Sequence, residues 1–101
     1  MTHPNKIKGS NYERELTNQA KEVGLDAIRA YASNGISLGK CEAVDLMIDG
    51  VTVQAKRRKK LAAYMKIPDN VDIVVMREDR GESLAIVPFK KILKLIKDGL
   101  W

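Results

Sequence analysis

The chain has 101 residues, of which 18 are Lys or Arg and 13 are Asp or Glu, giving a formal net charge of +5. This length fits one domain, and we expect residues 1–101 to form it. Hydrophobic residues make up 45% of the chain, which excludes a disordered tail, and no apolar run approaches the roughly 20 residues of a membrane span. The single cysteine, Cys41, excludes an intrachain disulfide and a cysteine-rich zinc site. We therefore expect a small cytoplasmic protein without membrane contact, whose basic charge favours a polyanionic partner.

The N-terminal segment over residues 1–9 is predicted to be a flexible basic arm, which carries Lys8, and a helix is predicted to follow it. Ser10 and Glu13 form an S-x-x-E capping box, so the helix is predicted to begin at Ser10, and Gly24 is expected to end it. Apolar side chains recur there at helical spacing: Tyr12, Leu16, Ala20 and Val23.

The middle of the chain contains the strongest turn signal. A short strand is predicted over residues 25–31 and a loop over residues 32–41, and the dipeptide Asp49-Gly50 is then typical of a two-residue hairpin turn. If the turn is that tight, Asp45 lies opposite Gln54. One face of the predicted ribbon is entirely apolar: Val44, Leu46, Ile48, Val51, Val53 and Ala55. This pattern fixes the register, because a slip by one residue would turn the apolar set outward.

The C-terminal part is predicted to contain a short helix over residues 61–66 and two strands over residues 71–76 and 83–88. A final helix is predicted to begin near Pro88, which suits a first-turn position. This helix is expected to expose four lysines: Lys90, Lys91, Lys94 and Lys97. Together the elements predict an α/β fold in which a mixed β-sheet is flanked by helices.

One face of the predicted hairpin brings an acidic residue, an amide and a lysine together. Directly opposed residues of antiparallel strands have Cβ atoms about 4.5–5.5 Å apart, so Asp45 and Gln54 can direct two oxygens at one point. Lys56 projects from the same face as Gln54. Hard oxygen ligands favour Mg²⁺, and a lysine ammonium can stabilise charge on a phosphate. The alternative is an ordinary polar face that shows these side chains to water, because the spacing alone has little specificity.

Three blocks of the sequence carry a resemblance to a known family, and they occur in the order IKGSNYEREL, IRAYAS and VDLMIDGVTVQAK. The ordered set resembles the archaeal-type Holliday junction resolvases, which belong to the PD-(D/E)xK restriction-endonuclease-like superfamily. The similarity covers residues 6–60, and residues 84–92 resemble the family's closing strand and helix. The resemblance implies a restriction-endonuclease-like fold and a homodimer that cuts branched, four-way DNA junctions with Mg²⁺, for which Mn²⁺ can substitute.

The resemblance also implies roles for the residues that match the family's motifs. Glu13, Asp45 and Gln54 would be catalytic side chains that bind the metal, the backbone carbonyl of Ala55 would be a further ligand, and Lys56 would be the catalytic lysine. Arg14 and Arg29 look like phosphate-facing residues and Ser33 like the loop serine near the cut strand. The basic charges beside the predicted site and in the arm also favour phosphate contact: Lys8, Arg57, Arg58, Lys59 and Lys60.

The most important departure from the family pattern is Gln54, which stands where the family usually has Glu. An amide oxygen can coordinate Mg²⁺ but lacks the full negative charge, so we expect weaker metal binding rather than a dead site. Small nuclease domains of the virus-type VRR-NUC kind are similar in accepting Gln there. The other departures are Val44 in place of the usual proline and a longer loop between Arg29 and Asp45.

Several alternatives stay open from the sequence. The chain can be a flap, nick or general nuclease of the same fold, a catalytically inactive module that binds junction DNA, or a protein with only nonspecific nucleic-acid adhesion. Individual residues also have ordinary explanations: Glu13 can serve only the capping box, Arg14 and Arg29 can be surface charges, and Ser33 can be a turn residue. The sequence is equally compatible with a cellular and a viral origin. If the origin is viral, the expected location is the host cytoplasm.

Overall fold

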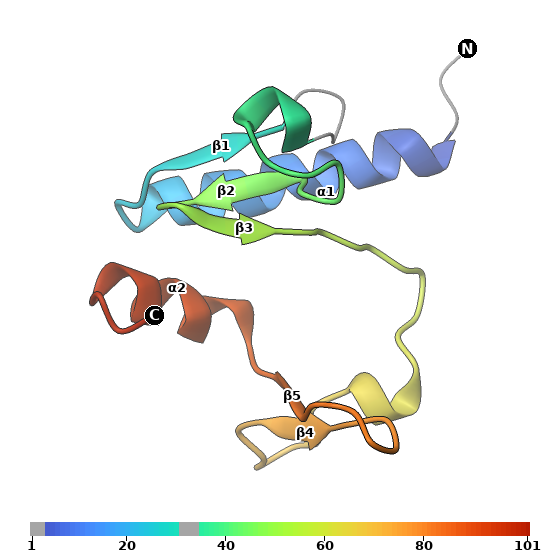
Figure 1. Cartoon of the computed structure of the whole chain (residues 1–101). Helices are drawn as coiled ribbons and strands as arrows, with labels where there is room; N and C mark the ends of the chain where they lie inside the picture. The colour runs from blue at the N-terminus through green and yellow to red at the C-terminus, as the bar shows by residue number, and fades with distance from the viewer. Residues whose placement is uncertain (1–3, 31–34) are drawn as a thin grey trace. The chain divides into compact units, whose positions relative to one another are not determined.

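The computed structural model describes residues 4–30 and 35–101, and the side chains of residues 4–9 are left undescribed. The chain forms two compact units, whose boundary falls between Arg57 and Arg58. The first unit contains the elements in the upper part of Figure 1: α1 (Pro4–Glu22), β1 (Ala27–Arg29), η2 (Gly35–Leu38), β2 (Leu46–Ile48) and β3 (Val51–Val53). The second unit contains the remaining elements: η3 (Ala63–Met65), β4 (Val74–Met76), β5 (Leu84–Ile86) and α2 (Phe89–Lys97). The predicted α/β class is confirmed, with the described strands divided between two antiparallel sheets.

The core of the first unit lies between α1 and a three-stranded sheet. β2 is the central strand of this sheet, with β1 and β3 antiparallel on either side. α1 runs along one face of the sheet and packs against β1 and β2 (Figure 1). Leu46 and Ile48 of β2 have 0% of their surface exposed. Burial of such a side chain contributes about 1.5–3 kcal/mol, so the apolar face of the ribbon anchors the unit.

The hairpin predicted at Asp49-Gly50 is confirmed in both turn and register. Asp49 has a φ of 47° and Gly50 a φ of 83°, which are the positive values that a type I′ turn requires at both central positions. Glycine adopts this conformation without steric strain. The ladder has the predicted pairs: Leu46–Val53, Met47–Thr52 and Ile48–Val51.

α1 begins at Pro4 and not at the predicted Ser10. Proline suits the first turn of a helix because the N–H that it lacks would have no hydrogen-bond partner within the helix there. Ser10 and Glu13 consequently lie inside the helix and do not form a capping box. The basic arm predicted over residues 1–9 therefore overlaps the helix from Pro4 onward, and only residues 1–3 lie before it, outside the described part.

The second unit contains the two predicted strands in shortened form, since β4 and β5 pair antiparallel over three residues each. The helix predicted over residues 61–66 is only the short 3₁₀ turn η3. α2 starts directly after Pro88, as predicted, and it buries Leu93 and Ile96. None of the helices in residues 4–30 and 35–101 is long and apolar enough to cross a membrane.

Candidate functional site

Asp45 lies where β2 and β3 stop pairing. The ladder ends at Leu46 and Val53, and beyond it the backbone N–H of Asp45 donates to the carbonyl of Val53 at 2.8 Å. The Asp45 carboxylate accepts a hydrogen bond from the backbone N–H of Ala55, with 2.7 Å between Oδ2 and N. The predicted pairing of Asp45 with Gln54 lies one step beyond the last pair of the ladder, Leu46 with Val53. A side-chain oxygen, and not a strand carbonyl, holds the Ala55 N–H where the regular ladder breaks off.

The hydrogen bond between Asp45 and Ala55 fixes the carboxylate beside the segment that carries Gln54 and Lys56. Hydrogen bonds from a backbone N–H to an ionised carboxylate are among the stronger ones in proteins. A carboxylate has about four lone-pair sites, so Asp45 retains acceptor capacity beyond this bond. Asp45 is half-buried, whereas Gln54 and Lys56 are exposed. The structure therefore ties the Asp45 carboxylate to the backbone of the segment that carries Gln54 and Lys56, and convergence of the three side chains on a metal stays a prediction.

Glu13 lies on the buried side of α1, with 3% of its surface exposed. Its backbone carbonyl accepts a hydrogen bond from Oγ1 of Thr17, which is itself buried, at 2.8 Å. Carboxylates at such depth in proteins are paired or coordinate metals. The capping explanation for Glu13 no longer applies, because the helix begins at Pro4. A buried carboxylate on the helix that packs against β2 fits the predicted ligand role.

The donors of the predicted metal site are all hard oxygen atoms. The carboxylates of Glu13 and Asp45, the Gln54 amide and the Ala55 carbonyl are the kinds of ligand that Mg²⁺ prefers. Within the described residues there is no group of three or more His, Cys, Asp or Glu side chains that could hold a metal ion. Gln54 leaves the predicted set with two carboxylates, so its chemistry fits Mg²⁺ but with one negative charge less than a set of three acids.

Arg29 is directed toward α1. It stands opposite Leu46 in the sheet, on the face that α1 covers, and its Nη2 donates to Oγ of Ser10 at 3.5 Å. Its Nε is buried and has no hydrogen-bond partner among the described residues. The side chain thus links β1 to the helix that carries Glu13, and its predicted contact with phosphate stays a prediction.

The other predicted DNA-binding residues of the first unit are only partly described. Arg14 is on the exposed side of α1 and lines a shallow polar depression there. Lys8 falls within α1, although its side chain is outside the described part, and Ser33 lies in the undescribed residues 31–34. Contact of these three residues with DNA stays a prediction.

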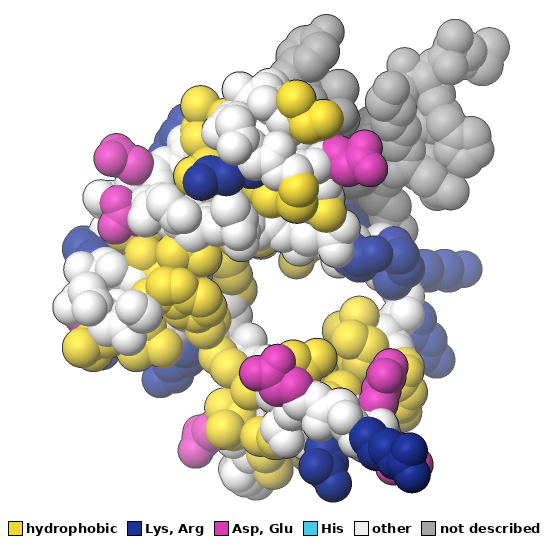
Figure 2. Space-filling model, in the orientation of Figure 1, with side chains coloured by type: hydrophobic (Ala, Val, Ile, Leu, Met, Phe, Trp, Pro, Cys, Tyr) yellow, Lys and Arg dark blue, Asp and Glu magenta, His cyan; other side chains and the backbone are white. Residues whose placement is uncertain are grey.

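The basic run follows β3 as an exposed segment without helix or strand. Figure 2 shows Lys and Arg side chains gathered where the chain leaves β3. All of its members are exposed: Lys56, Arg57, Arg58, Lys59 and Lys60. Five consecutive cations create a positive potential along this segment, which attracts a polyanion.

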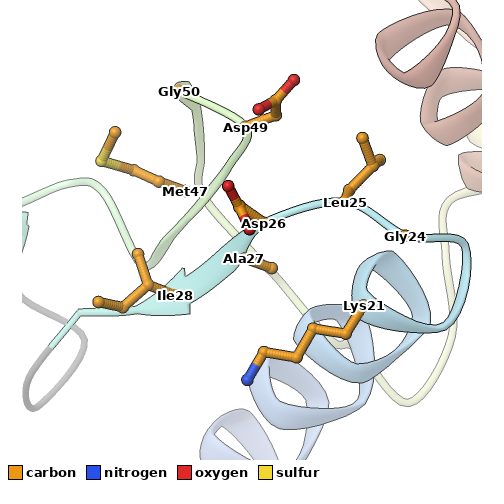
Figure 3. Close-up of a pocket in the computed structure, with 9 residues that line it drawn as sticks. All are labelled: Lys21, Gly24, Leu25, Asp26, Ala27, Ile28, Met47, Asp49 and Gly50. Carbon is orange, nitrogen blue, oxygen red and sulfur yellow. The ribbon is translucent and has the colours of Figure 1, made fainter.

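A shallow depression at the other end of β2 is separate from the predicted site. Asp26 and Asp49 lie side by side there, with the backbone N–H of Asp49 donating to the Asp26 carbonyl at 2.7 Å, while Lys21 extends from α1 (Figure 3). The depression contains none of the catalytic, metal-binding or DNA-binding residues that were predicted from the sequence. Its lining is drawn in Figure 3: Lys21, Gly24, Leu25, Asp26, Ala27, Ile28, Met47, Asp49 and Gly50.

Gly35 packs closely against the segment that leads into Asp45. It was not among the predicted site residues. It is buried, and a Cβ atom at this position would collide with the backbone carbonyl of Cys41 and lie 2.6 Å from Cβ of Val44. Val44 directly precedes Asp45. The sequence shows only a glycine in a polar loop, so nothing local distinguishes this close approach from an ordinary turn.

Comparison with known proteins gives one family. The model of the archaeal Holliday junction resolvase (Hjc) family matches residues 4–94. The match includes α1, the hairpin, both sheets and most of α2. No curated protein and no solved structure matches the chain.

Proposed function

The chain belongs to the archaeal Holliday junction resolvase family, and from this we propose that it is a Mg²⁺-dependent endonuclease that resolves four-way DNA junctions. Mn²⁺ is expected to substitute for Mg²⁺. The observation that best supports the location of the site is the 2.7 Å hydrogen bond between Asp45 and Ala55. This bond joins the carboxylate to the residue between Gln54 and Lys56, to which the family resemblance assigns catalytic roles, and so supports the proposal. We expect the protein to act in the cytoplasm.

The residues of the proposed site divide into metal ligands and a charge stabiliser. When bound, Mg²⁺ would supply an activated water and neutralise phosphate charge. Glu13, Asp45, Gln54 and the carbonyl of Ala55 would bind it. Lys56 would donate to the phosphate oxygen on which negative charge develops during the cut.

The proposal also includes the DNA contacts and the assembly. The basic run would neutralise phosphates that flank the cut, because clustered cations on a protein release counterions from DNA. Resolution of a four-way junction needs two symmetric cuts. One site per chain therefore calls for a homodimer with twofold symmetry.

A cleavage panel tests this function. Purified protein is incubated with a four-way junction, a flap, a nicked duplex and a linear duplex, each with Mg²⁺ and with Mn²⁺. We expect paired, symmetric incisions confined to the junction. Efficient cutting of flaps or nicks would instead assign a different nuclease of the same fold. Tight junction binding without cleavage of any of the four structures would assign an inactive binding module, which the presence of Gln54 makes the second candidate.

Gln54→Glu is expected to strengthen metal binding by about tenfold, because a carboxylate adds a full negative charge at the site. Calorimetric titration of the DNA-free protein with Mg²⁺ or Mn²⁺ measures this directly. Gln19→Glu introduces the same charge on α1 and should change the metal affinity little. Equal affinities for the Gln54→Glu variant and the unchanged protein would remove Gln54 from the set of ligands.

A further inference from the structure

α2 presents a surface of lysines that the proposed site does not use. We call Lys90, Lys91, Lys94 and Lys97 the lysine face; all four side chains are exposed. They are four of the nine residues of α2, and no acidic residue lies within the helix. Leu93 and Ile96 between them are buried, so the helix has one apolar side and one cationic side.

Helix electrostatics disfavour several of these positions. Lys90 and Lys91 lie in the first turn, which contains no acidic residue, and the N-terminal end of a helix carries a partial positive charge that repels cations. Lys90 and Lys94 are four residues apart, and Lys94 and Lys97 three apart, so like charges adjoin along the same surface. Lys94 and Lys97 lie in the last turn, where the dipole favours cations, so the unfavourable terms are the position of Lys90 and Lys91 and the repulsion between adjoining lysines. A bound anion would relieve both.

α1 shows that this chain can build an exposed helix surface without such repulsion. Its exposed charged residues from Arg14 onward alternate in sign: Arg14, Glu15, Lys21 and Glu22. Solubility alone would be served equally well by a mixed surface on α2. The first turn of α1 also lacks an acidic residue, so the difference between the two helices is the run of like charges on α2. Such a departure from a mixed surface is typical of a functional surface.

We propose that the lysine face binds the phosphate backbone of a duplex DNA arm, a contact additional to the catalytic site and the basic run. This inference rests on the proposed function, which supplies duplex arms as the substrate. Duplex DNA carries one negative charge per roughly 1.7 Å of axis, and a nine-residue helix is about 13 Å long, so several phosphates can face α2 at once. Lysine ammonium groups on flexible stems act as point charges and do not read bases, so the contact is independent of sequence.

The experiment compares the whole chain with a variant that carries Lys90→Gln, Lys94→Gln and Lys97→Gln. Affinities for a four-way junction and for a linear duplex are measured over a series of salt concentrations without divalent metal, so that nothing is cut. Loss of three phosphate contacts should make the slope of log affinity against log salt shallower by about 2 to 3 units for both DNAs. The ratio of junction to duplex affinity should stay the same. Glutamine keeps the helix propensity, and the relief of repulsion is offset by the loss of favourable charges in the last turn, so the melting temperature should change little.

The matched control carries Lys21→Gln, Lys40→Gln and Lys66→Gln, three exposed lysines elsewhere on the chain. It has the same net charge as the α2 variant but should keep a slope closer to that of the unchanged protein. Equal slope losses in the two variants would attribute the effect to net charge and overturn the proposal. An unchanged slope in the α2 variant would overturn the proposal as well. The same holds if the variant binds phosphatidylserine vesicles more weakly than the unchanged protein but binds DNA equally well.

Cleavage of junctions with Mg²⁺ separates this inference from the proposed function. A protein that never cuts, but whose α2 variant shows the shallower slope, keeps the DNA contact and loses the nuclease assignment. A protein that cuts junctions, but whose α2 variant has an unchanged slope, keeps the nuclease assignment and loses the contact.

Discussion

Asp45→Asn is expected to lower the rate of junction cleavage by about 100- to 1,000-fold while junction binding persists. The substitution removes the negative charge that the proposed metal site needs. In the unchanged protein the backbone N of Ala55 lies 2.7 Å from Oδ2 of Asp45. The amide oxygen of asparagine can still accept this hydrogen bond, so the end of the hairpin should remain folded. Single-turnover cleavage and gel-shift binding, measured on the same preparation, separate the two effects. Lys56→Ala should act in the same direction.

Asp49→Asn is the matched control for this prediction. It makes the same chemical change four residues further along the hairpin, at an exposed position of the turn. Asparagine is favoured in type I′ turns, so the fold should tolerate it. Cleavage by the Asp49→Asn protein should match that of the unchanged protein. If the Asp45→Asn protein also cuts at the normal rate, the site cannot be centred on Asp45.

Gly35→Ala is expected to destabilise the folded state by about 1–3 kcal/mol or more, because the added methyl group has no space. Its Cβ atom would meet the carbonyl of Cys41 and the Cβ of Val44, and the residue next to Val44 is Asp45. For a chain of this size each kcal/mol lowers the melting temperature by about 4–8 °C. Thermal unfolding followed by circular dichroism measures the loss. Below the melting temperature, a weaker Mg²⁺ affinity would show that the displacement reaches Asp45.

Gly39→Ala provides the comparison within the same loop. Nothing lies within 4 Å of a Cβ atom at Gly39, and only its φ of 73° opposes a side chain. This backbone conformation costs an alanine roughly 1–2 kcal/mol, but the added methyl group meets no neighbouring atom that could pass a displacement on to Asp45. We expect a loss of stability with an unchanged Mg²⁺ affinity. A Gly35→Ala protein as stable as the unchanged chain would show that the loop has room to move.

The parts of the fold that could be predicted are those specified by residues close together in the sequence. The hairpin was correct in turn and register because Asp49-Gly50 selects the turn and the flanking alternation selects the buried face. The predicted start of α2 was correct because Pro88 marks it. The start of α1 was wrong because the S-x-x-E pattern at Ser10 also fits a helix interior, where Pro4 supplies an earlier first turn.

The candidate site shows the same limit. The spacing of Asp45, Gln54 and Lys56 could be assigned to neighbouring strands, but the pattern does not say where a ladder ends. The hydrogen bond from Ala55 to Asp45 forms at such an end, so spacing alone could not predict it. Gly35 was missed because its significance comes from close contact with a later part of the loop. Alternation and spacing carry no information about such contacts.

The tight turn also affects how the hairpin part of the candidate site, with Asp45 and Lys56, forms during folding. Asp45 and Lys56 are joined by a single hairpin closed by a two-residue turn, so few chain conformations have to be excluded to bring them together. Isolated hairpins form in about 1–10 μs, which is fast for a structure that carries both an acid and a lysine. Asp45 and Lys56 can therefore be in register before α1, the helix that carries Glu13, docks against the sheet.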